Sequence, residues 1–253
     1  MPRERVTQPD VRFYHTEMSS EGILRDQIDY YRARAGEYDE WWFRAGRYDR
    51  GPELNARWLA DVAAVEQALA SWLDATRPQS VLELACGTGL FTRHIAPRVA
   101  RLTAVDASPE VLAINRSRVD AVNVEYVQAD LFAWRPPERY QAVFFSFWLS
   151  HVPEARFAAF WRTVSSALAP GGAAYLIDSA FDPTSTAKDH VLPGRDAEIV
   201  TRRLNDGREF RIVKLFYTPE TLAARLAAAG FASDIRQTAQ YFIYGWARPS
   251  PAA

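Results

Sequence analysis

The stretch VLELACGTGLFT, residues 81–92, decides the fold. A short run of valine and leucine contains the acid Glu83 and is followed by two glycines, Gly87 and Gly89, and then by an apolar segment typical of a helix start. Glycine has no Cβ, so a strand, a glycine loop and a helix in this order let the backbone approach a ligand closely. The stretch therefore predicts a ligand-binding loop at the carboxyl edge of a parallel sheet.

Two further acids follow the same pattern. Asp106 stands at the end of the next apolar run, where a carboxylate can bind both hydroxyls of a ribose. Asp130 ends the run after that one. Because the carboxyl ends of parallel strands meet at one edge of the sheet, we expect both acids in the crevice beside the glycine loop. Together with Glu83 they predict a nucleoside-binding half-domain.

The rest of the chain alternates between strand and helix signals, which is typical of a doubly wound, Rossmann-like sheet. Asn205-Asp206-Gly207, between two apolar runs, signals a β-hairpin, and two last β-type runs are expected to form an antiparallel pair. We expect an α/β fold with a seven-stranded sheet, mostly parallel with an antiparallel C-terminal strand, an N-terminal helical lid and an inserted hairpin. The expected strands of the sheet are residues 81–84, 102–105, 124–127, 142–147, 173–177, 232–237 and 241–247.

A helical pattern begins at Ile23 and is expected to run on through Trp42, and a second amphipathic helix follows it. The segments on either side of the core are polar and without pattern. We divide the chain into a flexible arm (1–22), a helical lid with the first helix (23–78), a core (79–248) that carries the hairpin insertion (196–217), and a tail (249–253).

Composition excludes several classes of function. The 30 basic and 31 acidic residues give a net charge of −1, without the basic excess expected of a nucleic-acid partner. The single cysteine, Cys86, cannot form an internal disulfide, and no cysteine–histidine cluster has the spacing of a metal site. The charged N-terminus does not resemble a signal peptide, and no apolar run reaches membrane-spanning length. We therefore expect a cytoplasmic protein without a metal or membrane partner, and leave its oligomeric state open.

Five motifs in register resemble the class I S-adenosylmethionine-dependent methyltransferases. They are ELACGTG (83–89), AVDASPE (104–110), QADLF (128–132), FFSFWLSHVP (144–153) and LAPGG (168–172). The resemblance implies S-adenosyl-L-methionine as cofactor. The chain departs from the family at Ala85, where the family has a glycine.

The resemblance also implies roles for individual residues. Backbone amides near Gly87 and Gly89 would lie against the methionine part of the cofactor, with Glu83 holding the loop or the cofactor's amino group. Asp106 would bind the ribose, and Asp130 the adenine amino group. The remaining residues expected around the cofactor are Ala85, Ala107, Leu131 and Phe147.

Two other classes of protein could also carry such a glycine loop. A nicotinamide-dependent dehydrogenase would need a glycine where this chain has Thr92, and Glu83 ahead of the loop also favours the methyl donor. An inactive nucleoside-binding module would bind the cofactor without turnover.

On the acceptor side, His151 follows the fourth expected strand, where it would border the transferred methyl group. The stretch YYRARAGEYD (30–39) resembles the lid of small-molecule methyltransferases of bacterial secondary metabolism. In a helix, Tyr31 and Arg34 would fall on adjacent turns. We expect Tyr31 and His151 to be catalytic, and both to contact the acceptor together with Arg34.

The hairpin carries an unusual density of positive charge, and it resembles the matching hairpin of a phosphonate O-methyltransferase. If its turn has three residues, Arg202 and Lys214 project from the same face, whereas a two-residue turn separates them. We therefore expect Arg202 and Lys214 to bind a small anionic acceptor, a phosphonate or carboxylate, that is methylated on oxygen. His151 would then act as an orienting donor.

The sequence leaves the identity of the acceptor open for two reasons. A neutral phenol or amine natural product would instead need His151 as base. The chain is also longer than the matching methyltransferase at residues 46–57 and around residues 184–193, both near the expected pocket.

Overall fold

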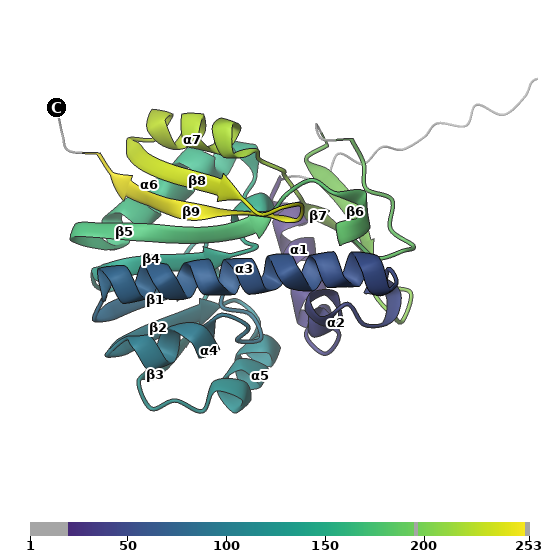
Figure 1. Cartoon of the computed structure of the whole chain (residues 1–253), viewed down its shortest axis with the longest axis horizontal. Coiled ribbons are helices and arrows are strands. Elements are labelled where there is room, and N and C mark those ends of the chain that lie inside the picture. Colours follow the sequence, from purple (N-terminus) through teal and green to yellow (C-terminus); the bar gives the residue numbers. More distant parts are fainter. Residues whose placement is uncertain (1–19, 195–196, 251–253) are drawn as a thin grey trace, which may run out of the picture.

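One seven-stranded sheet dominates the structure, a computed structural model that describes residues 20–194 and 197–250 (Figure 1). Its strand order is β3-β2-β1-β4-β5-β9-β8. β9 pairs antiparallel with both of its neighbours, and the other pairs of the sheet are parallel, which confirms the expected fold class. The strands are β1 (Ser80–Leu84), β2 (Arg101–Asp106), β3 (Val124–Gln128), β4 (Tyr140–Ser146), β5 (Leu168–Ser179), β8 (Phe231–Gln237) and β9 (Phe242–Pro249).

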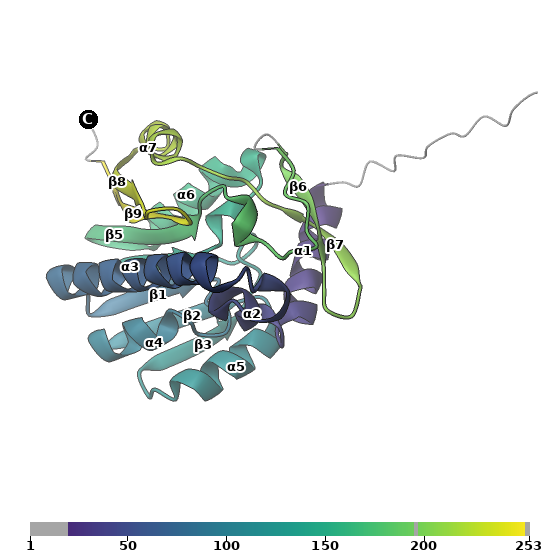
Figure 2. The ribbon, with the colours of Figure 1, turned by 45° about the vertical axis from the view of Figure 1, so that its right-hand side comes forward.

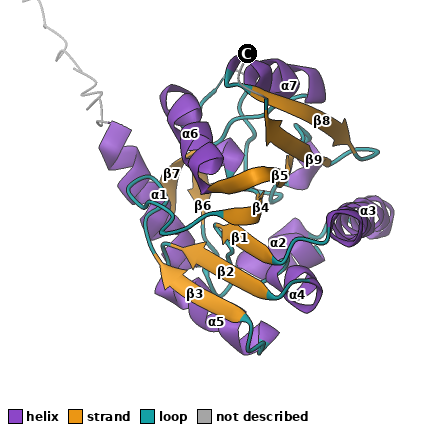
Figure 3. Cartoon of the chain, turned by 90° about the vertical axis from the view of Figure 1, so that its left-hand side faces the viewer, coloured by secondary structure: helices purple, strands orange, loops and turns teal. Residues whose placement is uncertain are grey.

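Helices cover both faces of this sheet (Figure 3). Side chains alternate along a strand, so Ala142 and Phe144 of β4 face one core layer while Val143 and Phe145 face the other. The first layer is closed by α3 (Pro52–Thr76) and α4 (Thr92–Ile95), the second by α6 (Phe157–Ala167) and α7 (Pro219–Ala228). The sheet is therefore buried on both sides, and its carboxyl edge is left to build a site.

The helix after β2 begins with a proline and a serine cap. Pro109 is the first residue of α5 (Pro109–Val119), and the Ser108 hydroxyl accepts from the Val111 amide at 3.3 Å. Such a cap satisfies one of the free amides of the first turn. It holds the segment after Asp106 in a fixed direction. The described residues also form short 3₁₀ helices: η1 (Gly46–Tyr48), η2 (Ala96–Arg98), η3 (Leu149–His151), η4 (Glu154–Arg156) and η5 (Pro183–Ser185).

The N-terminal lid differs from the prediction. Instead of one helix through Trp42, α1 (Ser20–Arg34) ends before Gly36, and α2 (Tyr38–Phe43) starts in a new direction. Glycine has low helix propensity, and the Glu37 amide bonds back to the Arg34 carbonyl at 2.9 Å in a tight turn. The predicted arm (1–22) overlaps this helix, because residues 20–22 already belong to α1. Residues 1–19 of the arm and 251–253 of the tail lie outside the described residues, and Pro249 belongs to β9.

The hairpin forms a separate two-stranded sheet of β6 (Ile199–Arg203) and β7 (Glu209–Val213), which lies against α1 (Figure 2). Arg202 pairs with Phe210, and the Leu204 amide bonds to the Arg208 carbonyl at 2.9 Å. The loop therefore has three residues, 205–207. This register points Arg202 and Lys214 to the same side. Within the described chain, the structure has no helix both long and apolar enough to cross a membrane.

Candidate active site

Two cavities adjoin each other at the carboxyl edge of the sheet. The loop cavity lies over the glycine loop and has an empty volume of about 740 Å³. The hairpin cavity lies between lid and hairpin and has an empty volume of about 570 Å³. The two cavities share one wall, made of Tyr31, Tyr38, Phe147 and His151.

Asp106 is the polar centre of the loop cavity. Its Oδ2 accepts from the Gly87 amide and its Oδ1 from the Ser108 amide, both at 3.0 Å. A carboxylate offers about four lone-pair positions, so each oxygen retains capacity for a ligand hydroxyl. Burial raises the pKa of Asp106, and the backbone amides oppose that shift.

Two residues of the loop cavity have strained backbones. Ala85 (φ 53°) and Phe147 (φ 51°) follow β1 and β4 in the left-handed region, which residues with a Cβ rarely adopt. Glycine adopts this conformation easily, which explains why the methyltransferases that the sequence resembles have glycine at the position of Ala85. Strain of this kind gathers at functional sites.

The predicted cofactor residues divide into two groups. Seven of them line the loop cavity: Ala85, Gly87, Asp106, Ala107, Asp130, Leu131 and Phe147. Glu83 and Gly89 are not among its lining residues. Gly89 instead packs against α5, since a Cβ there would lie 2.7 Å from Asn115 Oδ1.

Glu83 lies in the core at the end of β1. It is 1% exposed, its Oε2 has no partner among the described residues, and burial raises its pKa to about 8. The free lone-pair positions on Asp106 fit a cofactor that carries a ribose. The lining residues of the loop cavity that the sequence reasoning missed include Gln27, Ile28, Phe132 and Trp148.

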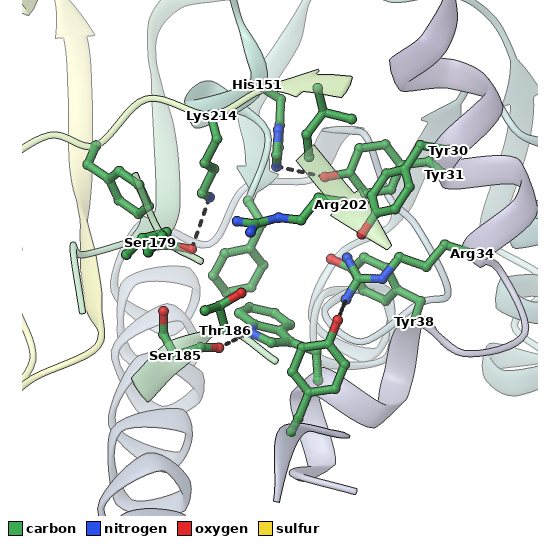
Figure 4. Close-up of a pocket in the computed structure, with 16 residues that line it drawn as sticks. Tyr30, Tyr31, Arg34, Tyr38, His151, Ser179, Ser185, Thr186, Arg202 and Lys214 are labelled. Atoms are coloured by element: carbon green, nitrogen blue, oxygen red, sulfur yellow. Dashed lines mark hydrogen bonds between the residues drawn. The ribbon is translucent and has the colours of Figure 1, made fainter. Parts of the chain in front are cut away.

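The hairpin cavity brings together the predicted acceptor residues (Figure 4). Tyr31 and Arg34 come from α1, His151 from the exit of β4, and Arg202 and Lys214 from the hairpin. These three parts of the chain are far apart in sequence. Lining residues that the sequence reasoning did not single out include Tyr48, Ser185, Thr186 and Leu192, which belong to or flank the two longer segments.

The hydrogen bonds of His151 fix its tautomer. Nδ1 lies 2.6 Å from the Val213 carbonyl, which can only accept, so Nδ1 carries the proton. Nε2 must then accept the bond from the Tyr31 hydroxyl at 2.7 Å. Burial, with the charge of Lys214 second, lowers the pKa of His151 well below its usual range, so the ring is neutral at pH 7. His151 thus orients Tyr31, rather than acting as the donor to the acceptor that we expected.

Gln27 connects the lid to this arrangement. Its Nε2 donates to the His151 carbonyl, and its Oε1 accepts from the Val213 amide, both at 3.1 Å. Gln27 is 2% exposed, so these bonds are shielded from water. One lid side chain therefore holds both the residue that carries the imidazole and the residue that sets its tautomer.

The charges of the hairpin cavity do not balance. Arg202 is buried, its Nη1 has no hydrogen-bond partner, and no carboxylate of the described residues forms an ion pair with it or with Arg34. Lys214 Nζ lies 3.7 Å from Asp178 Oδ1 and donates to Ser150 Oγ at 2.8 Å. Buried charges are ordinarily paired. Two unpaired guanidinium groups in one cavity make it complementary to an anion.

Comparison with known proteins agrees with this geometry. A family model described as a methyltransferase domain matches residues 81–172. The chain is 32% identical over 216 residues to the ubiquinone biosynthesis O-methyltransferase of Xanthomonas campestris pv. campestris (strain B100), covering 83% of this chain and 82% of that protein. It is 29% identical over 177 residues to the 2-phytyl-1,4-naphtoquinone methyltransferase of Thermosynechococcus vestitus, covering 66% of this chain and 78% of that protein.

Solved structures extend the similarity to almost the whole chain. DhpI in complex with S-adenosylhomocysteine (SAH) is 38% identical, with a TM-score of 0.75, and the match covers 92% of this chain and 100% of DhpI. A second DhpI structure, with S-adenosylmethionine (SAM) and a molecule designated HEP, has a TM-score of 0.73 at the same identity and coverage.

Proposed function

Because this chain belongs to the S-adenosylmethionine-dependent methyltransferases, with a small molecule as acceptor, we propose that the acceptor is an anion, a phosphonate or a carboxylate, that is methylated on oxygen. One observation carries the proposal: the unpaired guanidinium groups of Arg202 and Arg34 in the hairpin cavity. An anionic acceptor would supply the missing partner and relieve the cost of burying these charges. The likeness of the lid and hairpin to natural-product methyltransferases supports a role in secondary metabolism.

We assign the loop cavity to the cofactor. Asp106 binds the ribose hydroxyls, Asp130 the adenine amino group, and Leu131 and Ala107 pack on the base. When bound, S-adenosylmethionine would supply a methyl group attached to a positively charged sulfur. The positive charge activates the methyl carbon for transfer. The protein then has to align this carbon with the acceptor and exclude water.

The shared wall is where transfer takes place in this proposal. An ionised oxygen needs no general base, so the chain's residues have only to hold it at the wall. Arg202 and Lys214 bind the anionic group, and the ring of Tyr31, held by the hydrogen bond from its hydroxyl to His151, forms the wall beside it. Tyr38 and Phe147 exclude water on either side.

A second candidate is methylation of a neutral phenol or amine. The neutral His151 favours it, because Nε2 accepts from Tyr31 and so can take a proton passed on through the Tyr31 hydroxyl. This candidate leaves the unpaired charges of the cavity without a role.

A panel of phosphonates, carboxylates, phenols and amines, with release of S-adenosylhomocysteine as readout, separates the two candidates. We expect turnover of the anions, and its loss in Arg202→Ala and Lys214→Ala. Turnover of phenols or amines alone, with both variants as active as the parent, would rule out the anionic acceptor and leave the methyltransferase assignment intact.

A further inference from the structure

We propose that Tyr48, together with Arg34, forms a second polar subsite in the hairpin cavity, and that it binds an oxygen atom on the tail of the acceptor. The proposal rests on the proposed function, because it treats this cavity as the acceptor site. It predicts an acceptor with oxygen at both ends: an anionic group at Arg202 and Lys214, and a hydroxyl or carboxylate at Tyr48.

The first step is the direction of the Tyr48 hydroxyl. Arg34 Nη2 donates to Tyr48 Oη at 3.1 Å, so the hydroxyl acts as acceptor toward Arg34 and its own hydrogen points elsewhere. Tyr48 is 4% exposed and lines the hairpin cavity. No residue in 20–194 or 197–250 accepts a hydrogen bond from it. A buried hydroxyl without a partner for its hydrogen is unusual, and a ligand oxygen would complete it.

Arg34 points to the same conclusion. Its Nε is buried and has no partner in the described part of the chain. The guanidinium is held among tyrosine rings, with its central carbon 4.8 Å from the centre of Tyr38 and 5.8 Å from that of Tyr48. Aromatic rings fix the position of the cation without using up its hydrogen bonds. Tyr48 and Arg34 therefore offer donors only, and the matching ligand group is a hydrogen-bond acceptor.

The second step is the rigidity of Tyr48. Two arginines on either side of it clamp the segment to consecutive carbonyls of residues 184–187. Arg44 donates to the carbonyls of Thr184 (2.7 Å) and Ser185 (3.3 Å). Arg50 donates to those of Thr186 (2.9 Å) and Ala187 (3.2 Å). A donor held in place before the ligand arrives loses little conformational entropy on binding.

The clamped segment also closes the cavity. Ser185 and Thr186 line it, and Figure 4 shows them on the opposite side from His151. The Ser185 hydroxyl donates to the Asp182 carbonyl at 2.7 Å, so it is not available to donate to a ligand. This end of the cavity therefore limits the length of the acceptor, and Tyr48 offers a hydroxyl donor to it.

Three phosphonates of equal chain length test the subsite: propylphosphonate, 3-hydroxypropylphosphonate and 3-phosphonopropionate. The enzymes are the parent, Tyr48→Phe and the control Tyr244→Phe on β9, outside both cavities, with kcat/KM measured by S-adenosylhomocysteine release. Tyr48→Phe keeps the ring and removes only the hydroxyl. We expect it to lower kcat/KM for the two oxygen-bearing compounds about three- to tenfold and to leave propylphosphonate unchanged. The control should match the parent on all three.

Equal kcat/KM of the parent for all three phosphonates, with no effect of Tyr48→Phe, would overturn the subsite while the anionic acceptor stands. A uniform loss on all three would also overturn it, because Tyr48 would then act only by positioning Arg34 or the lid. If the parent turns over phenols or amines and no anion, the proposed function fails, and the subsite with it. Calorimetric binding of S-adenosylhomocysteine should be the same in the parent and Tyr48→Phe, since Tyr48 does not line the loop cavity.

Discussion

Burial sets the protonation of the residues that face the acceptor. His151 is neutral because its ring is buried and Lys214 lies nearby, and its proton sits on Nδ1 because the Val213 carbonyl accepts it. Burial also lowers the pKa of Lys214, to about 8, although Asp178 opposes the shift. His151 therefore keeps the same charge across the physiological pH range, whereas Lys214 loses its charge at the upper end of that range. The pH dependence of the enzyme should come from the lysine.

We expect kcat/KM for an anionic acceptor to fall above about pH 8, mainly through a rise in KM. A lowered pKa means that Lys214 loses its proton, and with it the attraction for the anion, well below the ordinary pH of lysine. His151 should add no inflection between pH 6 and 8, since it is already neutral there. Profiles from pH 6 to 9.5 of the parent and Lys214→Arg check this. Ionisation of the acceptor is common to both, so a fall at the same pH in both enzymes would contradict the assignment.

At the scale of elements, the hairpin decides which charges reach the cavity. Arg202 and Arg203 are neighbours on β6, but they project from opposite faces of the strand. Arg202 is buried in the cavity, whereas Arg203 is exposed and pairs with Glu209 across the hairpin. The loop of three residues, 205–207, creates this difference, because a register shifted by one residue would exchange the faces.

Replacing each arginine by glutamine tests the hairpin register. Arg202→Gln should lower kcat/KM for an anionic acceptor at least about tenfold, the loss of a charge-assisted bond of roughly 1.5–3 kcal/mol. It should not lower the melting temperature, since it removes an unpaired buried charge. Arg203→Gln, the matched control, should stay within about twofold of the parent, because exposed ion pairs contribute little. Similar losses in both variants, or a destabilised Arg202→Gln, would count against the assigned faces.

These elements also mark the limits of sequence reasoning. The positions of Asp106 and Asp130 follow from the apolar runs before them and from the parallel topology, and both residues line one cavity. The sequence did not predict from which face of the hairpin Arg202 projects, because sequence alone does not determine the length of the hairpin loop. The expected helix through Trp42 was wrong because one glycine, Gly36, outweighs the favourable pattern around it. The clamp on residues 184–187 uses backbone carbonyls, which every residue has, so it leaves no signature in the sequence.

At the scale of the whole molecule, the lid is built into both cavities. Tyr31 and Tyr38 stand in the shared wall, so the lid contributes side chains to both cavities. The lid is also fastened to the cofactor side, where Asp39 on α2 accepts from the Thr88 hydroxyl in the glycine loop at 2.7 Å and from Arg118 on α5. Arg118 bonds Thr88 in turn, at 3.2 Å. This network joins the lid to the loop that faces the cofactor.

If the network holds the lid closed, weakening it should speed the release of the cofactor product. Asp39→Asn removes the charge that faces Arg118 and keeps the shape of the side chain. We expect the dissociation rate of S-adenosylhomocysteine, measured by stopped-flow displacement, to rise about fivefold, as for the loss of a half-buried charge-assisted bond. Asp29→Asn is the control, because Asp29 is exposed on the same lid, on α1. Asp39 does not line the loop cavity, so faster release in its variant would report on the lid and not on a lost ligand contact. An unchanged rate in Asp39→Asn, or an equal rise in the control, would mean that the cofactor leaves without the lid opening.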